Sequence, residues 1–202
     1  MLYVAVGASD TVGVGTADPQ REAWPRGFLR TALPEGTQYR TFATSGATTA
    51  TALQRQVPKA VELQPDVVTV WLNVNDLVRF VPAPTYESQL RMAVRRLRRG
   101  GRSTVLVATT PAIEQLPVVA SFGIPADVVR QSVEAYNAAI VRVAQAEGAV
   151  VVDLHSHRIE AELVAADGFH PSPAGHAAVA AAFTAAYRGA PNTEATNASE
   201  AS

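Results

Sequence analysis

The serine at position 9 stands where a nucleophile could act. It follows a short apolar run in the segment Gly7-Ala8-Ser9-Asp10, and a serine on a strand-to-helix turn can expose its hydroxyl at the edge of a sheet. A serine hydroxyl is a poor nucleophile until a base takes its proton. His170 can serve as that base, because Asp167 precedes it by three residues and can accept a hydrogen bond from one imidazole nitrogen. The spacing predicts a catalytic triad in which the other imidazole nitrogen faces the serine.

Each of these residues also has a plainer explanation. Ser9 could form the turn and cap a helix, and His170 could be a surface residue in a loop before a helix. Gly13 and Gly15 follow closely, as in a phosphate-binding loop, but neither the dinucleotide-binding fingerprint nor the Walker lysine pattern is present. His176 falls inside the last predicted helix, where we expect a surface or packing residue. The conjunction of serine, histidine and aspartate favours catalysis.

A second group of polar residues, Asp153, His155 and His157, alternates along the chain as metal ligands sometimes do. The segment is the end of a predicted strand, where polar residues are expected anyway, and no fourth ligand is apparent. We therefore expect no metal, and acyl transfer through a serine needs no organic cofactor. Asp153 remains an alternative acid for the triad.

Acyl transfer also needs hydrogen-bond donors for the oxyanion of the tetrahedral intermediate. Gly46, in Thr44-Ser45-Gly46-Ala47, can present a backbone N–H with no side chain in the way. Asn75, in Asn73-Val74-Asn75-Asp76, can present its side-chain amide. Each has an ordinary explanation by itself, as a glycine before a helix and as an Asn-Asp turn. Together with Ser9 they predict three donors in one crevice.

Short apolar runs rich in β-branched residues alternate with longer segments of helical period. The predicted strands are Leu2–Val6, Tyr39–Ala43, Val67–Leu72, Thr104–Ala108 and Val150–Leu154. The predicted helices are Ala23–Leu33, Thr49–Leu63, Tyr86–Arg98, Ala126–Glu147 and Pro173–Tyr187. This alternation predicts an α/β fold with a doubly wound parallel sheet, whose ligands bind at the carboxyl ends of the strands. We expect a single domain over residues 1–188 and a disordered tail over 189–202, which lacks large apolar side chains.

The composition excludes several classes of function. The 202 residues carry a formal net charge of -1, so no overall field attracts nucleic acid or an anionic membrane. Cysteine is absent, which excludes a disulfide framework and a thiol nucleophile. No apolar run approaches the roughly 20 residues that cross a bilayer. We expect a soluble, cytoplasmic protein without nucleic-acid or integral membrane partners, unless a leader has been removed.

The sequence resembles the SGNH (GDSL-type) hydrolases, whose four sequence blocks supply a serine, a glycine, an asparagine and a histidine in that order. The matching segments are Gly-Ala-Ser-Asp at Ser9, Ser-Gly-Ala-Thr at Gly46, Asn-Val-Asn-Asp at Asn75 and Asp-Gly-Phe-His-Pro-Ser at Asp167 and His170. The resemblance implies a three-layer α/β/α, flavodoxin-like fold with a five-stranded parallel sheet in the order 2-1-3-4-5. It also implies a serine esterase whose oxyanion hole is formed by Ser9, Gly46 and Asn75.

Two positions depart from the family pattern. Ala8 stands where the first block usually has aspartate, and Asn73 stands where the third block usually has glycine. Neither change removes a catalytic group. We expect the first to loosen the hydrogen bonding of the nucleophile turn and the second to add a polar side chain near the site.

An apolar segment suggests where a substrate could bind. Residues 113–125 follow the fourth predicted strand and are long and apolar for a connection, which predicts a wall or lid over the cleft. The segment around Phe80 could form the facing wall. The expected substrate contacts are Phe80, Leu116, Val119, Phe122 and Ile124. The alternative is that these residues only pack on the domain.

The predicted reaction is hydrolysis of a small-molecule carboxylic ester, such as an acyl ester, a thioester or a lysophospholipid, through an acyl-enzyme on Ser9. An acyl chain is favoured over a sugar, because aromatic residues, on which sugars usually stack, make up only 6% of the chain. Two alternatives stay open: an acyltransferase of the same fold, and a non-catalytic binding protein that keeps the cleft. The sequence does not indicate the oligomeric state.

Overall fold

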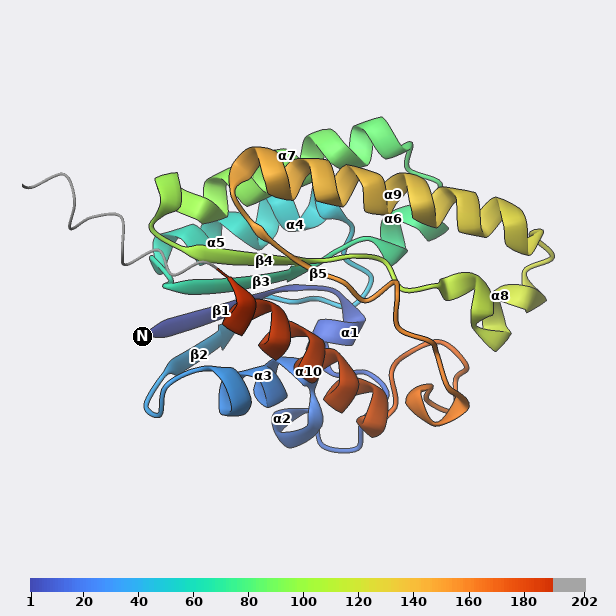
Figure 1. Ribbon diagram of the computed structural model, residues 1–202, viewed down its shortest axis with the longest axis horizontal. Helices are drawn as coiled ribbons and strands as arrows, with labels where there is room; N and C mark the ends of the chain where they lie inside the picture. Colours follow the sequence, from blue (N-terminus) through green and yellow to red (C-terminus); the bar gives the residue numbers. More distant parts are fainter. Residues whose placement is uncertain (191–202) are drawn as a thin grey trace, which may run out of the picture.

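A parallel sheet of five strands forms the centre of the molecule. The computed structural model describes residues 1–190, and its strands follow the order β2-β1-β3-β4-β5 (Figure 1). The strands are β1 (Leu2–Gly7), β2 (Gln38–Thr41), β3 (Val67–Trp71), β4 (Thr104–Ala108) and β5 (Val150–Val152). Each neighbouring pair runs parallel. The predicted flavodoxin-like strand order is therefore confirmed.

Helices cover both faces of the sheet and complete three layers (Figure 1). One face is covered by α4 (Thr49–Arg55), α5 (Val57–Glu62), α7 (Ala83–Arg98) and α9 (Ala126–Glu147). The other face is covered by α3 (Trp24–Ala32) and α10 (Pro173–Gly189). The shorter elements are α1 (Ser9–Val12), α2 (Pro19–Glu22), α6 (Val74–Val78), α8 (Pro117–Ser121) and the 3₁₀ turns η1 (Arg99–Gly101), η2 (Ile113–Gln115) and η3 (Ala161–Leu163). The predicted α/β/α class is confirmed.

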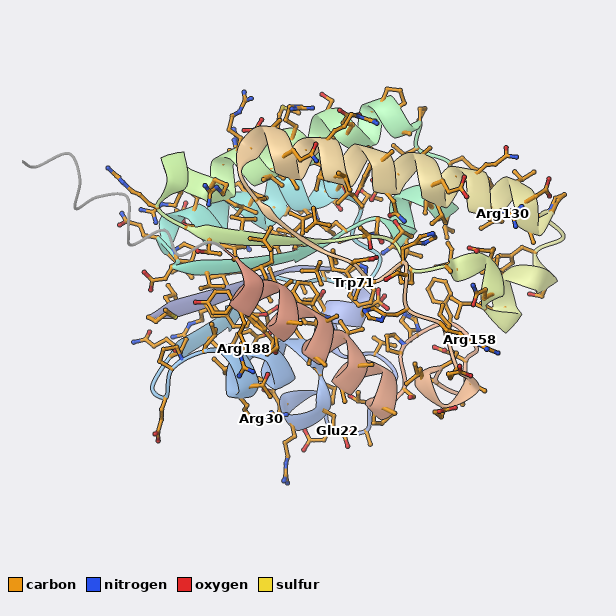
Figure 2. The ribbon with its side chains drawn as sticks, viewed as in Figure 1. Glu22, Arg30, Trp71, Arg130, Arg158 and Arg188 are labelled. Carbon is orange, nitrogen blue, oxygen red and sulfur yellow. The ribbon has the colours of Figure 1, made fainter. Side chains whose placement is uncertain are left out.

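Alternating side chains along the strands build a separate core on each face of the sheet. In β1, Val4 and Val6 belong to the core under α4, α7 and α9, whereas Tyr3 and Ala5 belong to the core under α3 and α10. Figure 2 shows charged side chains such as Arg130 at the outside of the molecule and Trp71 in its interior. Because the central strands are buried on both faces, they have continuous apolar sequences, which made them recognisable.

One predicted helix is wrong, because the structure divides the segment Thr49–Leu63 into α4 and α5. Gln56 lies at the division, and Pro58 stands in the first turn of α5. Proline has no N–H to donate to a preceding turn, so one hydrogen-bonded helix does not continue through it. The division leaves the Gln56 side chain buried beside the end of β1.

The carboxyl ends of the strands lie at one edge of the sheet, where the expected site should form. At this edge α1 follows β1, a loop over 42–48 follows β2, α6 follows β3, and a long segment over 153–172 follows β5.

Two further expectations concern the ends of the chain and membranes. Most of the predicted tail over 189–202 lies outside the described residues, apart from Gly189, which ends α10, and Ala190. Among the helices within residues 1–190, none has the length and apolar character needed to cross a membrane.

Candidate active site

Ser9, His170 and Asp167 form a hydrogen-bonded chain at this edge of the sheet. His170 Nε2 lies 3.0 Å from Ser9 Oγ, and His170 Nδ1 lies 2.6 Å from Asp167 Oδ2. An ionised carboxylate can only accept, so we assign the proton of the neutral imidazole to Nδ1, and Nε2 then presents a lone pair to the serine hydroxyl. The structure thus brings together three residues of which the first and last are 161 positions apart.

The loop before α10 holds Asp167 in place for this contact. Asp167 Oδ1 accepts hydrogen bonds from the backbone N–H groups of Phe169 at 2.9 Å and His170 at 3.0 Å. Burial raises the pKa of Asp167, but the hydrogen bonds from His170 and Phe169 outweigh it, and the pKa lies below its ordinary value. The carboxylate is therefore ionised at neutral pH, and one of its oxygens fixes the loop while the other orients the imidazole.

The turn that carries Ser9 depends on the contacts of Gly7, two residues before it. A Cβ atom on Gly7 would lie 2.0 Å from Thr11 Oγ1, so a larger residue would push α1 away from the end of β1. The Gln56 side chain accepts from the Gly7 N–H and donates to the Gly7 carbonyl, both at 3.0 Å. The sequence did not reveal Gln56, because a lone glutamine in a helical segment carries no chemical signature.

The predicted oxyanion donors come from the loops that follow β2 and β3. Gly46 lies in a turn in which Ala47 N–H donates to the Thr44 carbonyl at 3.0 Å, and its φ of +76° is the left-handed conformation that glycine favours. Asn75 lies in the first turn of α6. Within residues 1–190, neither the Gly46 N–H nor the Asn75 side chain forms a hydrogen bond, so both donors are free to meet a ligand.

A buried carboxylate joins these two loops. Asp76, next to Asn75, accepts from the backbone N–H of Thr49 at 2.9 Å and from its hydroxyl at 3.1 Å. Burial raises the pKa of Asp76, and the hydrogen bonds from Thr49 oppose this rise. Since Thr49 begins α4, just after the Gly46 turn, this contact ties the two donor-bearing segments to each other. The sequence indicated only a turn at Asp76, because its partner is distant along the chain.

Both residues that depart from the family pattern, Ala8 and Asn73, are buried. Ala8 is buried in the core on the α4 side of the sheet. Asn73 is also buried, and its side-chain amide donates to the Ala108 carbonyl at the end of β4, at 3.3 Å. The extra polar side chain therefore bridges two strand ends.

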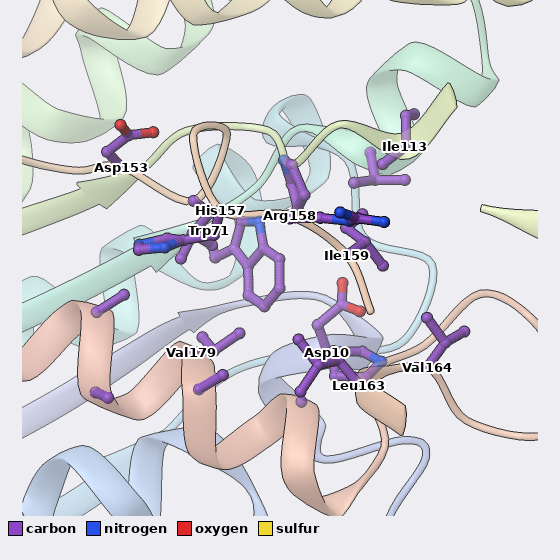
Figure 3. Close-up of a pocket in the computed structure, with 18 of the residues that line it drawn as sticks. Asp10, Trp71, Ile113, Asp153, His157, Arg158, Ile159, Leu163, Val164 and Val179 are labelled. Carbon is purple, nitrogen blue, oxygen red and sulfur yellow. The ribbon is translucent and has the colours of Figure 1, made fainter. Parts of the chain in front are cut away.

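Only one of the five expected substrate contacts lies at the cavity next to the triad. This cavity has a volume of about 800 Å³ and is lined by Asp10, Trp71 and Leu116, among others (Figure 3). Four expected contacts do not line it: Phe80, Val119, Phe122 and Ile124. Phe80 and Phe122 are 77% and 56% exposed, whereas Val119 is buried in a small core. In the apolar segment over 113–125, some residues therefore pack in the protein and others are exposed to solvent.

Asp10 places a second carboxyl group beside the serine. Figure 3 shows its side chain directed into the cavity. Burial raises the pKa of Asp10, while the charge of a protonated His170 lowers it. The sequence showed this residue as the neighbour of Ser9 but gave no sign that it faces an apolar space.

Asp153, His155 and His157 do not form a metal site. Asp153 Oδ1 accepts from the backbone N–H groups of His155 at 2.8 Å and Ser156 at 3.1 Å, so this carboxylate closes the turn after β5. No group of three possible protein ligands converges on a metal position within the described chain.

His176 is a buried structural residue that connects α10 with α3 and with the loop after α1. Its Nδ1 accepts from Trp24 N–H at 3.2 Å, and its Nε2 donates to the Val14 carbonyl at 3.0 Å. Both bonds require a neutral ring, since Nδ1 must keep its lone pair. Burial lowers the pKa of His176, and the hydrogen bond to Val14 only partly offsets this.

This lowered pKa makes His176 a source of acid sensitivity. Below the ordinary histidine pKa of about 6.5 the unfolded chain takes up a proton that the folded protein does not, so the free energy of unfolding falls as the pH drops. Glutamine can make the same two hydrogen bonds without titrating. We therefore expect the free energy of unfolding, measured with urea, to fall less between pH 8 and pH 5.5 for His176→Gln than for the wild type. Equal losses would contradict the assignment.

Comparison with known proteins identifies the family and the fold. A profile of the GDSL-like Lipase/Acylhydrolase family matches residues 5–178, whereas no curated protein matches the sequence. Similar solved structures include the psychrotrophic esterase EstA from Pseudoalteromonas sp. (14% identity, 93% of this chain and 96% of that chain, TM-score 0.73). They also include the lipase/acylhydrolase from Enterococcus faecalis (21%, 91% and 93%, TM-score 0.73) and the acetylxylan esterase Axe2 from Geobacillus stearothermophilus (22%, 92% and 93%, TM-score 0.73).

At these identities the likeness to solved structures shows the shared fold. The family profile, in contrast, spans most of the sequence and includes the positions of Ser9 and His170. The chain therefore belongs to the GDSL-like lipase/acylhydrolase family, a family of ester-hydrolysing enzymes.

Proposed function

We propose that the protein hydrolyses carboxylic esters of small molecules through an acyl-enzyme on Ser9. The observation that carries this proposal is the chain of contacts from Asp167 to His170 to Ser9, with distances of 2.6 and 3.0 Å. A serine becomes nucleophilic when a base within hydrogen-bond reach is itself oriented by a third group. Membership of the family supports ester bonds as the class of substrate.

In the first half of the reaction, Ser9 Oγ attacks the carbonyl carbon of the ester while its proton moves to His170 Nε2. The carbonyl oxygen becomes an oxyanion, which accepts hydrogen bonds from the Ser9 N–H, the Gly46 N–H and the Asn75 amide. The carbon–oxygen bond to the alcohol then breaks, and His170 gives its proton to the departing oxygen. The products are a free alcohol and an acyl group on Ser9.

In the second half, His170 takes a proton from water, and the resulting hydroxide attacks the acyl carbonyl. The new oxyanion is bound by the same donors. Its collapse breaks the bond to Ser9 Oγ, which recovers its proton from His170, and releases the carboxylic acid. Asp167 stabilises the imidazolium that forms in each half.

Turnover of p-nitrophenyl acetate by the purified protein, beside the variant Asn75→Ala, tests this function. We expect the wild type to release p-nitrophenol catalytically. The variant should lose about 10²- to 10³-fold in kcat, the usual effect of removing one oxyanion donor, with a smaller change in KM.

The matched control is Val78→Ala, which truncates an exposed side chain on the same helix and should keep wild-type kcat. A wild type that releases no nitrophenol from any ester would contradict the proposed function. Equal kcat for wild type and Asn75→Ala would remove Asn75 from the oxyanion site.

A further inference from the structure

The cavity described above, lined by Asp10 and Trp71, extends as a groove along one side of α10. At the start of that helix it lies beside Phe169 and Pro171, the neighbours of His170. On the helix it is lined by small residues, most of them spaced three and four apart on one face: Gly175, Ala178, Val179, Ala181, Ala182, Ala185 and Ala186. The large side chain of Phe183, four residues after Val179, does not line the groove but is buried and stacks on Trp24, with ring centroids 4.2 Å apart. Small side chains on one face of α10 therefore leave open the space that bulkier residues would fill.

The other walls of the groove come from the sheet and from the segment after β5. The sheet contributes Trp71 and Val151, and the segment after β5 contributes Leu154, Ile159 and Leu163. Near the active site the lining includes Asp10, which adjoins Ser9, and Phe169 and Pro171, which flank His170. The groove is thus mostly apolar, with Asp153, His157 and Arg158 among its polar lining residues, and it reaches Asp10, the neighbour of Ser9 (Figure 3).

Trp71 gives a second, independent indication of a ligand. Its side chain is 5% exposed and lines the groove, yet its indole N–H has no acceptor among the described residues. Eight buried side-chain atoms of the described residues lack a partner, and the Trp71 nitrogen is the one that belongs to a residue lining this groove. Buried donors in native proteins are usually paired, and an indole nitrogen can only donate. An oxygen atom of a bound molecule would supply the missing acceptor.

Resting on the proposed esterase function, we infer that this groove binds the hydrophobic chain of the ester, and that the chain carries an oxygen atom which accepts from the Trp71 N–H. The groove follows α10 from Gly175 to Ala186, which spans about 16 Å at about 1.5 Å per residue. An extended chain advances about 1.2 Å per bond, one third of the length of an extended residue. A linear chain of about twelve carbons therefore fits.

The chain can belong to the acid or to the alcohol of the ester, and two substrate series separate these sources. One series is p-nitrophenyl esters of linear acids from acetate upward, and the other is acetate esters of linear alcohols of growing length. The measured quantity is kcat/KM for each chain divided by kcat/KM for the shortest substrate of that series, in the wild type and in each variant.

The variants Ala178→Phe, Ala182→Phe and Ala186→Phe place a ring at successive turns of α10. We expect the ratio of kcat/KM for long chains to kcat/KM for the shortest substrate to be at least tenfold lower than in the wild type in one of the two series. The chain length at which it falls should increase from position 178 to 182 to 186. Ala178 is exposed, so that variant tests the inference even where a half-buried site such as Ala182 tolerates no ring. Ala177→Phe is the matched control, because Ala177 lies on the opposite flank of the helix.

The possible results are distinct. Ratios that stay at wild-type values in both series, in variants that still turn over the shortest substrates, would overturn the groove and leave the esterase function in place. A wild type that hydrolyses no ester of either series would overturn the function itself, and the inference with it.

Trp71→Phe tests the oxygen atom separately, because it removes the N–H and keeps an aromatic ring. The substrates are p-nitrophenyl octanoate and its analogues with one ether oxygen at successive chain positions, and the corresponding acetate esters of octanol and its ether analogues. In the wild type we expect one position to raise kcat/KM roughly fivefold over the plain chain, the gain from one neutral hydrogen bond. Trp71→Phe should abolish that preference. No preferred position in the wild type would overturn the assignment of Trp71.

Discussion

Replacing Ser9 by alanine is expected to lower kcat for p-nitrophenyl acetate by at least about 10⁴-fold. The substitution removes the atom that bonds to the acyl carbon, so no acyl-enzyme can form. It leaves the backbone N–H at position 9, the Gly46 turn and Asn75 intact. The residual rate then reflects water attacking an ester that is held and polarised by the remaining donors.

The fold should tolerate this change. The Ser9 hydroxyl forms one hydrogen bond among the described residues, to His170, and alanine leaves out no other atom of this side chain. The urea midpoint of the variant should therefore match that of the wild type. A fluorophosphonate probe should add its mass to the wild type once, on the peptide that contains Ser9, and should not label the variant.

Ser132→Ala is the matched control, because it removes a half-buried serine hydroxyl that donates to the Val128 carbonyl within α9, and it should change neither labelling nor turnover. Wild-type turnover by Ser9→Ala would exclude a serine mechanism at this position.

Asp167→Asn is expected to lower kcat by about 10³- to 10⁴-fold while keeping the loop structure. The asparagine carbonyl can still accept from the N–H groups of Phe169 and His170, as Oδ1 does now. Its NH₂ group takes the place of Oδ2, however, and donates to His170 Nδ1. The imidazole proton must then sit on Nε2, so the nitrogen that faces Ser9 can no longer take a proton from it.

Asp153→Asn provides the comparison, since Asp153 also accepts two backbone N–H groups in a turn. Its carboxylate does not contact His170, so kcat on p-nitrophenyl acetate should stay within about tenfold of the wild type. The two variants should show similar circular dichroism spectra and very different rates. A larger loss in Asp153→Asn than in Asp167→Asn would assign the triad acid to Asp153.

Much of the fold was predictable because its central strands are buried on both faces. The β-branched runs such as Val67–Leu72 identify such strands without any knowledge of their neighbours. The order of the strands, in contrast, came from the resemblance to a family. The division at Gln56 was missed because the apolar period continues across it, although Pro58 was a signal that one helix could not run through.

In the candidate site, likewise, contacts between residues close in sequence were predictable, whereas contacts between distant residues were not. Asp167 and His170 are close in sequence, so their contact follows from turn geometry. The bonds from Gln56 to Gly7 and from Asp76 to Thr49 join residues 49 and 27 positions apart, and no local pattern encodes such pairs. The groove was missed for another reason, because a helix rich in alanine predicts helicity but does not reveal the empty volume beside it.

The contact between Asp76 and Thr49 has a consequence for how substitutions combine. Because one carboxylate joins the Gly46 turn to the start of α6, movement of either segment is transmitted to the other. Thr49 and Asp76 are in contact, so the effects of substitutions at these two residues on the free energy of unfolding are not expected to be additive. A family member that altered one of these loops would keep the proposed oxyanion donors in place only if the other loop changed with it, so the two segments are expected to evolve as a pair.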